Sequence, residues 1–239
     1  MVRKGRYGAS VTAISKDTTA DRSSFGLPSF VLAEHAFIPV VPYMIIPTCQ
    51  PESGKLPFPL LRAQRVVLRQ LRGEDAGALV EIFSHPEVLR YWGGAALLSE
   101  LAAREFIGSA DGLRAQNVLH VWGIARADDD RILGTATLAQ VDIRNKRAEV
   151  GYALGRDHWG RGYMAEALPV LIRHAFDTLE LHRLEADVDP RNGPSVRILE
   201  RLGFQREGFL RERWVINGEI QDSLMFGLLR PDWQLRAGG

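Results

Sequence analysis

One short segment carries the clearest chemical signal: it reads Arg156-Asp157-His158-Trp159-Gly160-Arg161-Gly162-Tyr163-Met164-Ala165-Glu166. It joins an expected strand to an expected helix through two glycines. Backbone N–H groups at a helix start, together with the positive end of the helix dipole, bind phosphate, and glycine lets the phosphates approach closely. Arg161 would add a charge-assisted contact. The alternative is a tight turn that needs glycine for its geometry alone.

A second segment lies at another strand-to-helix junction and reads Asp189-Pro190-Arg191-Asn192-Gly193-Pro194-Ser195-Val196-Arg197. Asn and Ser three residues apart are typical helix-capping residues, so Asn192 and Ser195 are expected at the start of a helix. Gly203 is expected to end that helix.

Two other phosphate-binding patterns and a metal site are disfavoured. Gly160-x-Gly162-x-x-Ala165 formally matches a dinucleotide fingerprint, with Glu185 in the acidic position. However, about five residues separate the preceding strand from Gly160, and only one parallel crossover follows. No glycine-lysine-serine or glycine-lysine-threonine run is present, which disfavours a Walker-type phosphate loop. The six histidines are not spaced as metal ligands, and one cysteine alone cannot form a cysteine-based metal site.

Composition excludes several classes. The chain has 239 residues and a net charge of +1, which argues against a general nucleic-acid or anionic-membrane binder. The single Cys49 cannot form an internal disulfide, which fits a reducing compartment. No apolar run reaches the roughly 18 residues that span a bilayer. We therefore expect a cytoplasmic protein that binds neither membrane nor nucleic acid.

The first quarter of the chain differs from the rest. Residues 1–60 hold seven of the 12 prolines, which disfavour both helix and central strand. We expect a flexible, proline-rich extension over residues 1–60 and a single domain over residues 61–239.

Within that domain the hydrophobic periodicity predicts alternating strands and helices. Strands are expected at 66–71, 118–127, 132–141, 148–154, 183–188, 204–214 and 220–228. Helices are expected at 73–83, 99–109, 163–179 and 194–202. Pro169 should kink the third of these helices or confine its regular part to later residues. Asn217-Gly218 predicts a hairpin turn between the last two strands. This order predicts an α/β (α+β) fold with a mixed sheet.

Several separated motifs together resemble one family, the GNAT acetyltransferases. They are Glu149-Val150-Gly151-Tyr152, Trp159-Gly160-Arg161-Gly162-Tyr163-Met164-Ala165-Glu166-Ala167, His182-Arg183-Leu184-Glu185-Ala186, Asn192-x-x-Ser195 and Leu202-Gly203-Phe204. The nearest branch resembles the RimJ/RimL-like ribosomal-protein N-terminal acetyltransferases. The resemblance spans roughly residues 64–233. It implies a mostly antiparallel central sheet, helices on both faces and one splayed parallel strand pair.

The resemblance also implies acetyl-CoA as co-substrate and no metal. The residues expected to bind it are Val150, Tyr152, Ala153, Leu154, Trp159, Gly160, Arg161, Gly162, Tyr163, Met164, Ala165, Asn192 and Ser195. The acceptor is expected to be the N-terminal amine of a protein or peptide, bound by a monomer or homodimer. The alternatives are a small amine, such as a polyamine, aminoglycoside or amino acid, and a non-catalytic acetyl-CoA-binding regulatory module.

Four side chains are candidates for catalysis or acceptor binding. Glu149 is the candidate base, acting through water, against the alternative of a solvent-facing carboxylate. Ser195 is the candidate proton donor to the leaving thiolate, against a capping role. Trp92 and Trp214 are candidates for lining the acceptor groove, against a place in the core. Many family members carry a tyrosine acid near Leu199, which this chain lacks.

Overall fold

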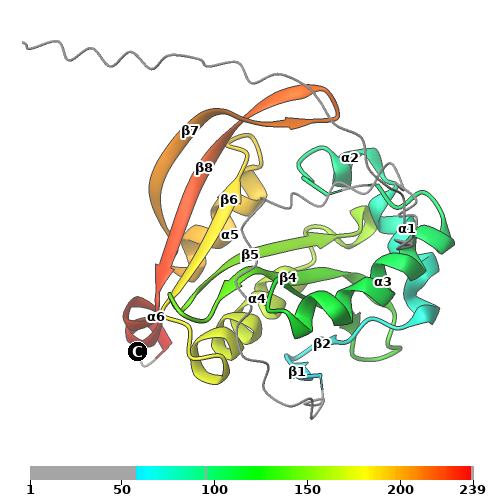
Figure 1. Ribbon diagram of the computed structural model, residues 1–239, viewed down its shortest axis with the longest axis horizontal. Coiled ribbons are helices and arrows are strands. Elements are labelled where there is room, and N and C mark those ends of the chain that lie inside the picture. Colours follow the sequence, from blue (N-terminus) through cyan, green and yellow to red (C-terminus); the bar gives the residue numbers. More distant parts are fainter. Residues whose placement is uncertain (1–57, 95, 238–239) are drawn as a thin grey trace, which may run out of the picture. The chain divides into compact units, whose positions relative to one another are not determined.

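The computed structural model describes residues 58–94 and 96–237 (Figure 1). Its strands are β1 (Leu61–Arg62), β2 (Val66–Arg69), β3 (Leu119–Arg126), β4 (Ile132–Asp142), β5 (Arg147–Leu154), β6 (Arg183–Val188), β7 (Gln205–Ile216) and β8 (Glu219–Leu229). Its α-helices are α1 (Ala76–Phe83), α2 (Pro86–Leu89), α3 (Glu100–Ala115), α4 (Tyr163–Arg173), α5 (Gly193–Leu202) and α6 (Arg230–Ala237). Two 3₁₀ turns, η1 (Gly73–Asp75) and η2 (Arg156–His158), and a π-helical turn, η3 (His174–Thr178), complete the described elements.

All eight strands form one sheet in the order β1-β2-β3-β4-β5-β6-β8-β7. Each neighbouring pair is antiparallel except β5–β6, which is parallel. The expected mixed, mostly antiparallel sheet with one parallel pair is therefore confirmed.

The parallel pair separates along its length. Pairing between β5 and β6 runs from Arg147–Arg183 to Glu149–Glu185. Beyond that register, β5 stays paired with β4 as far as Leu154, and β6 stays paired with β8 as far as Val188. Each strand thus keeps its outer partner while the two diverge from each other (Figure 1). This is the splayed parallel pair that the family resemblance implies.

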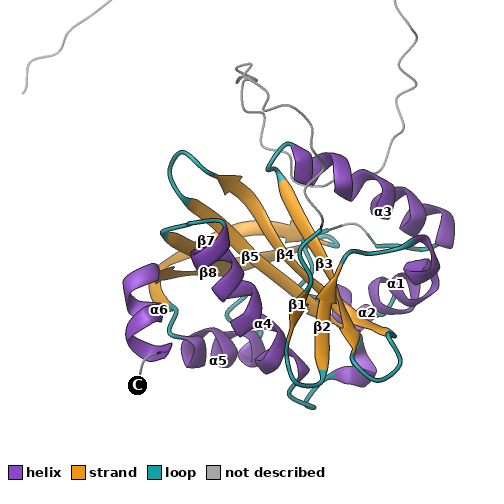
Figure 2. Cartoon of the chain, turned by 90° about the horizontal axis from the view of Figure 1, so that it is seen from below, coloured by secondary structure: helices purple, strands orange, loops and turns teal. Residues whose placement is uncertain are grey.

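Helices cover both faces of the sheet because its strands alternate apolar residues between two cores. On β3, Trp122 and Ile124 belong to the core that includes α4 and α5, whereas Val121 and Ala125 belong to the core that includes α1 and α3. Figure 2 shows α4 and α5 on one side of the sheet and α1 and α3 on the other.

The helix ends follow their capping residues. The Ser99 hydroxyl accepts a hydrogen bond from the Ala102 N–H at 3.2 Å and starts α3. The Asn192 side chain accepts from the Ser195 N–H at 3.3 Å and starts α5, and Gly203, at φ 95°, ends it in the left-handed conformation. Capping by Asn192 and termination at Gly203 are as predicted.

Two helices differ from their expected extents. α3 continues to Ala115, beyond the expected end at residue 109, and stops before Asn117, whose φ is 55°. α4 begins directly at Tyr163 with Pro169 inside it, so the expectation that Pro169 confines the regular helix to later residues is wrong. Proline removes one N–H donor, and the remaining hydrogen bonds and the buried face hold the helix.

Three short elements were not predicted: β1, α2 and α6. α2 carried a usable signal, because Pro86 occupies its first turn and the His85 ring accepts from the Glu87 N–H at 3.2 Å. β1 has two residues, and α6 is polar, so neither produces a hydrophobic period.

Most of the extension expected over residues 1–60 lies outside the described residues. Its last part packs on the domain: the ring centroids of Phe58 and Trp122 are 5.4 Å apart, and the Trp122 indole donates to the Pro59 carbonyl at 3.0 Å. Across residues 58–94 and 96–237, no helix is long and apolar enough to cross a bilayer.

We expect a pH-dependent stability from His120, which is 7% exposed. Burial, aided by the charges of Arg114 and His174, lowers the pKa of His120 to about 4. The unfolded chain, with a His pKa of about 6.5, therefore binds the proton more tightly. The free energy of unfolding should be maximal above about pH 6.5 and fall by about 3 kcal/mol as the pH drops to about 4. Urea unfolding between pH 4 and 8 measures it.

The control compares two histidine substitutions. His120→Leu should reduce the pH dependence of the free energy of unfolding. His182→Gln, at an exposed position, should leave that pH dependence unchanged. Burial lowers the pKa of His174 as well, so a smaller slope in the same direction should remain in His120→Leu. An unchanged slope in His120→Leu would contradict this assignment.

Candidate active site

The divergence of β5 from β6 leaves part of β5 without a strand partner on one side. From Val150 to Leu154 this strand is hydrogen-bonded to β4, so alternate residues direct their N–H and C=O groups toward the opening. Val150 and Leu154 are buried, and Tyr152 packs against the same core. A strand edge of this kind can bind an extended chain that carries amide groups.

The glycine-containing loop lies directly after this strand and ends at the start of α4. Gly160 and Gly162 adopt positive φ angles of 70° and 81°, which favour glycine. No side chain caps α4 at Gly162. Its first N–H groups, including those of Met164 and Ala165, therefore have no side-chain partner at the cap, and they lie at the positive end of the helix dipole.

Trp159 shapes this loop through its own hydrogen bond. Its indole N–H donates to the Leu154 carbonyl at 2.8 Å, and the Arg156 guanidinium lies 5.0 Å from its ring centre. Arg156 in turn pairs with Glu87 at 2.9 Å. Trp159 thus ties the loop to the end of β5.

Glu149 lies at the last position of β5 that pairs with β6, on the face opposite the core that contains Ala148 and Val150. Its carboxylate accepts from the Gln140 side chain at 3.3 Å. Burial raises the pKa of Glu149, and the charges of Asp187 and Glu185 raise it further, against Arg213 and Arg147. A carboxylate with a raised pKa is better matched to proton transfer near neutral pH.

The neighbouring carboxylates on β6 are neutralised by arginines. Glu185 pairs with Arg147 at 3.0 Å and with Arg183 at 2.8 Å. Asp187 pairs with Arg213 at 3.0 Å. Within the described part of the chain, Glu149 is the one of these three carboxylates that forms no ion pair.

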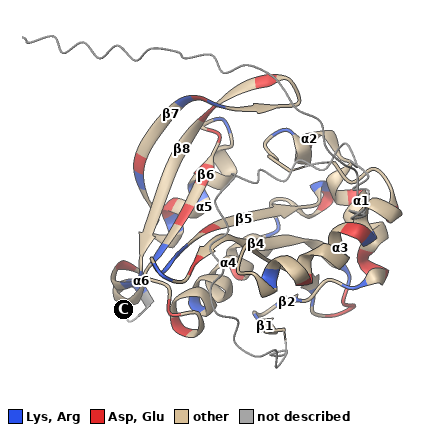
Figure 3. Ribbon diagram, in the orientation of Figure 1, with Lys and Arg blue, Asp and Glu red and all other residues tan. Residues whose placement is uncertain are grey.

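Trp214 contacts one of these carboxylates. Its indole donates to Asp187 at 3.0 Å, and the buried Ser223 hydroxyl donates to the same carboxylate. The register between β7 and β8 shifts between Leu210 and Trp214, where Glu212 has a φ of 52°. Basic and acidic residues both occur along the β7–β8 hairpin (Figure 3).

Tyr152 connects the opening to α5. Its hydroxyl donates to the Ser195 carbonyl at 3.5 Å, and burial raises the pKa of Tyr152 to about 12. Ser195 itself is partly buried in the first turn of α5, next to the capping Asn192. Leu199 lies in the core, so this helix offers no phenol at that position.

Trp92 follows a segment that contacts the hairpin, since the Gln221 side chain, opposite Trp214, donates to the Arg90 carbonyl at 3.1 Å. The Trp92 ring packs against Phe83, with centroids 4.8 Å apart, beside the core under α1 and α3. Ala153 faces that same core from β5. Asp187 thus links Trp214, which donates to it, and Glu149, whose pKa it raises, while Trp92 packs on Phe83.

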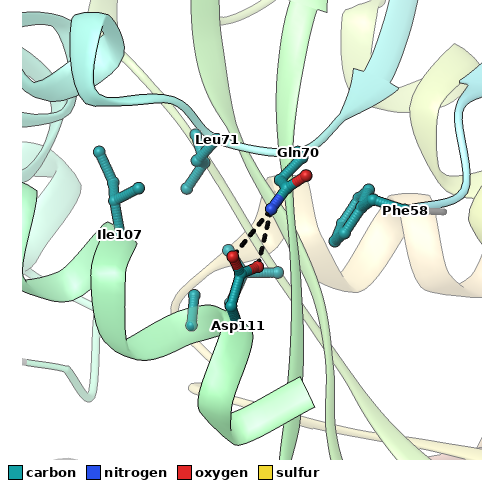
Figure 4. A pocket seen from close by; sticks show the side chains of 7 residues that line it. Phe58, Gln70, Leu71, Ile107 and Asp111 are labelled. Carbon is teal, nitrogen blue, oxygen red and sulfur yellow. Dashed lines mark hydrogen bonds between the residues drawn. The ribbon is translucent and has the colours of Figure 1, made fainter. Parts of the chain in front are cut away.

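The described residues form an open depression at the hairpin and a narrow crevice beside α3. An open depression of about 500 Å³ lies between the segment after β6 and the β7–β8 hairpin, and is lined by Asp189, Pro190, Arg191, Phe209, Glu212, Ile220 and Asp222. A crevice of about 10 Å³ lies between α3 and the end of β2, where Gln70 donates to Asp111 at 2.8 Å (Figure 4). The crevice is too small for a cofactor. Among the described residues, no cluster of His, Cys, Asp and Glu suits a metal ion.

Four residues whose contacts shape this region were not among the site residues expected from the sequence: Arg65, Glu166, Asp187 and Ser223. Arg65 contacts Glu166 and the Arg161 carbonyl, 101 and 96 residues away. Asp187 and Ser223 are 36 residues apart. A single sequence holds no signal for such distant pairs.

Comparison with known proteins identifies the family. A family model for an acetyltransferase (GNAT) domain matches residues 65–205, more than half of the chain. The chain is 37% identical over 173 residues to the uncharacterized N-acetyltransferase p20 of Bacillus licheniformis, covering 72% of this chain and 97% of that protein. It is 28% identical over 185 residues to the [ribosomal protein uS5]-alanine N-acetyltransferase of Escherichia coli, covering 75% and 95%.

A solved structure agrees in fold. Mycobacterium smegmatis RimJ, in complex with CoA-disulfide, superimposes with a TM-score of 0.67 at 23% identity, covering 76% of this chain and 94% of that one. The resemblance to the RimJ/RimL-like branch is thus confirmed. This chain belongs to the GNAT family and is an acetyltransferase.

Proposed function

We propose that this enzyme moves the acetyl group of acetyl-CoA to the N-terminal α-amino group of a protein or peptide, by direct attack in a ternary complex. One observation carries the proposal: β5 and β6 diverge beyond Glu149–Glu185, beside the uncapped start of α4. Similarity to an enzyme named for the alanine of ribosomal protein uS5 supports a protein acceptor.

The residues around the opening fit acetyl-CoA. A side chain added at Gly160 would meet nothing within 4 Å, so the outside of the loop is open to a phosphate group. The first N–H groups of α4 carry no side-chain cap, so they remain available to the pyrophosphate. The free edge of β5 matches the amide groups of the pantetheine arm.

Each part of the chain has a defined task in this proposal. The backbone from Val150 to Leu154 binds the pantetheine, and residues 159–165 bind the pyrophosphate. Asn192, besides capping α5, contacts the pantetheine arm. The bound co-substrate supplies an acetyl thioester, the activated acyl group. A backbone N–H near Tyr152 or Ala153 donates to the oxygen on which negative charge develops.

Glu149 removes the proton from the acceptor amine, through water. An α-amino group has a pKa of about 8, so about a tenth of it is neutral at pH 7, whereas a lysine is neutral far less often. A protein N-terminus therefore needs less help from a base than a lysine does. The partly buried carboxylate of Glu149, without an arginine partner among the described residues, suits this modest requirement.

The leaving thiolate receives its proton from the Ser195 hydroxyl in this proposal, and that hydroxyl takes a proton from solvent water in the same step. Ser195 lies in the first turn of α5, and its carbonyl accepts from the Tyr152 hydroxyl across the opening. Its capping partner Asn192 accepts from the Ser195 backbone N–H, which leaves the Ser195 hydroxyl for this role.

A single assay tests the function. Acetyl-CoA-dependent thiol release is measured with N-terminal peptides, polyamines and aminoglycosides as acceptors. We expect release with peptides whose α-amine is free and none with the same peptides blocked at the N-terminus. Release with polyamines or aminoglycosides alone would overturn the acceptor assignment. Tight acetyl-CoA binding in calorimetry without release for any acceptor would favour the regulatory module.

The glycine loop generates the first prediction. Gly162→Val places a β-branched residue at φ 81°, and its side chain begins 3.1 Å from the Arg65 guanidinium, so the loop must move. We expect acetyl-CoA affinity in calorimetry to fall at least about tenfold.

Gly218→Val is the matched control for this substitution. Gly218 has the same φ of 81°, nothing within 4 Å of an added side chain, and lies in the hairpin turn away from α4. It should cost stability but leave acetyl-CoA affinity unchanged. Wild-type affinity in Gly162→Val would refute the placement of the pyrophosphate.

The second prediction concerns Glu149→Gln. Turnover should fall by about a hundredfold near neutral pH, and the deficit should shrink toward pH 9, where the amine loses its own proton. Because burial raises the pKa of Glu149, wild-type kcat/KM should decline with falling pH at a pH above the usual carboxyl range. Rate profiles from pH 6 to 9 measure both effects.

The control for this variant is Glu81→Gln, at an exposed position of α1. It should keep the wild-type profile. Acetyl-CoA affinity should change little in Glu149→Gln, since the carboxylate acts on the acceptor. Equal turnover of Glu149→Gln and wild type across this range would eliminate Glu149 as the base.

A further inference from the structure

Arg65, in the turn before β2, binds the first turn of α4. Its backbone N–H donates to one Glu166 carboxylate oxygen at 2.8 Å, and its guanidinium Nε donates to the other at 2.5 Å. Its own carbonyl accepts from the Ala127 N–H at 2.9 Å, just after β3. The chain around Arg65 is therefore fixed to the sheet on one side and to α4 on the other.

The same side chain also contacts the glycine loop. Guanidinium Nη2 donates to the Arg161 carbonyl at 3.1 Å, and the guanidinium carbon lies 5.0 Å from the ring centre of Tyr163. A side chain at Gly162 would begin 3.1 Å from this group. One residue thus touches the loop and the first turn of the helix together.

Glu166 poses an electrostatic problem at this place. A carboxylate in the first turn is attracted to the positive end of the helix dipole, which is also where the phosphate groups of the co-substrate would bind. Left alone, it would repel the phosphates and compete for the same N–H groups. Both of its oxygens are instead occupied by Arg65, and its side chain is only 19% exposed.

We infer that Arg65 is a positioning residue for acetyl-CoA binding: it holds the Arg161–Glu166 segment in its binding conformation and keeps the Glu166 carboxylate occupied. The inference rests on the proposed placement of the pyrophosphate at this loop. Arg65 itself is half exposed, so the ion pair contributes little to folding stability. Substitution of Arg65 should therefore lower the affinity for acetyl-CoA more than it lowers folding stability.

The experiment is calorimetry of acetyl-CoA binding, without acceptor, to wild type, Arg65→Gln, Arg65→Lys, Glu166→Gln and the double variant. Arg65→Gln should weaken binding about tenfold, since it removes two charge-assisted contacts. Arg65→Lys keeps the charge but cannot donate from Nε and Nη2 together, so it should recover affinity only in part. The double variant should bind no more weakly than Arg65→Gln, because the unpaired carboxylate is gone.

A matched control distinguishes the loss of the Arg65 contacts from a general loss of positive charge. Arg131→Gln removes another exposed arginine that pairs with a glutamate, Glu81, and should bind acetyl-CoA as wild type does. Melting temperatures of all variants should lie within about 3 °C of wild type.

The possible failures are distinguishable. Wild-type affinity in Arg65→Gln, or additive losses in the double variant, would overturn the role of Arg65 and leave the proposed function standing. Absence of acetyl-CoA binding in wild type would overturn the placement of the co-substrate and this inference with it. Binding without acetyl transfer to any peptide would overturn the acceptor alone and leave Arg65 supported.

Discussion

The architecture of the site depends on the end of parallel pairing between β5 and β6 after Glu149 and Glu185. The divergence is stable because each strand keeps an antiparallel partner on its outer side, β4 for one and β8 for the other. It exposes backbone hydrogen-bonding groups in the middle of an otherwise continuous sheet, where an unpaired group is costly unless something binds to it. The α4 loop begins where this free edge ends, so the two binding features are continuous.

Charge around the opening is distributed unequally among three carboxylates on neighbouring strands. Glu185 and Asp187 are occupied by arginines, and Asp187 also receives the Trp214 indole, so both stabilise the wall formed by β6 and the hairpin. Among the described residues Glu149 receives only a weak amide contact, and burial with its acidic neighbours raises its pKa. The paired carboxylates thus help to create the environment of the unpaired one.

Much of the fold was predictable because its signals are local. Period-two and helical patterns placed the long strands and helices, and Asn192 and Gly203 marked the ends of α5. Short elements escaped: two residues of β1 show no period, and the polar α6 has no apolar stripe. Pro169 does not confine the regular helix to later residues because one lost hydrogen bond weighs less than the buried face of α4, with Leu168 and Leu171 in the core.

The sequence by itself indicated the glycine loop and the capping pair Asn192 and Ser195 from residue types and spacing, and the family resemblance pointed to Glu149 as the candidate base. Only the tertiary structure decided their partners. It packed Trp92 on Phe83, bonded Trp214 to Asp187, and joined Arg65 to Glu166 across 101 residues. The physical reason is that spacing along the chain encodes local geometry, whereas ion pairs and pKa shifts depend on which distant groups the packed sheet brings within a few ångströms.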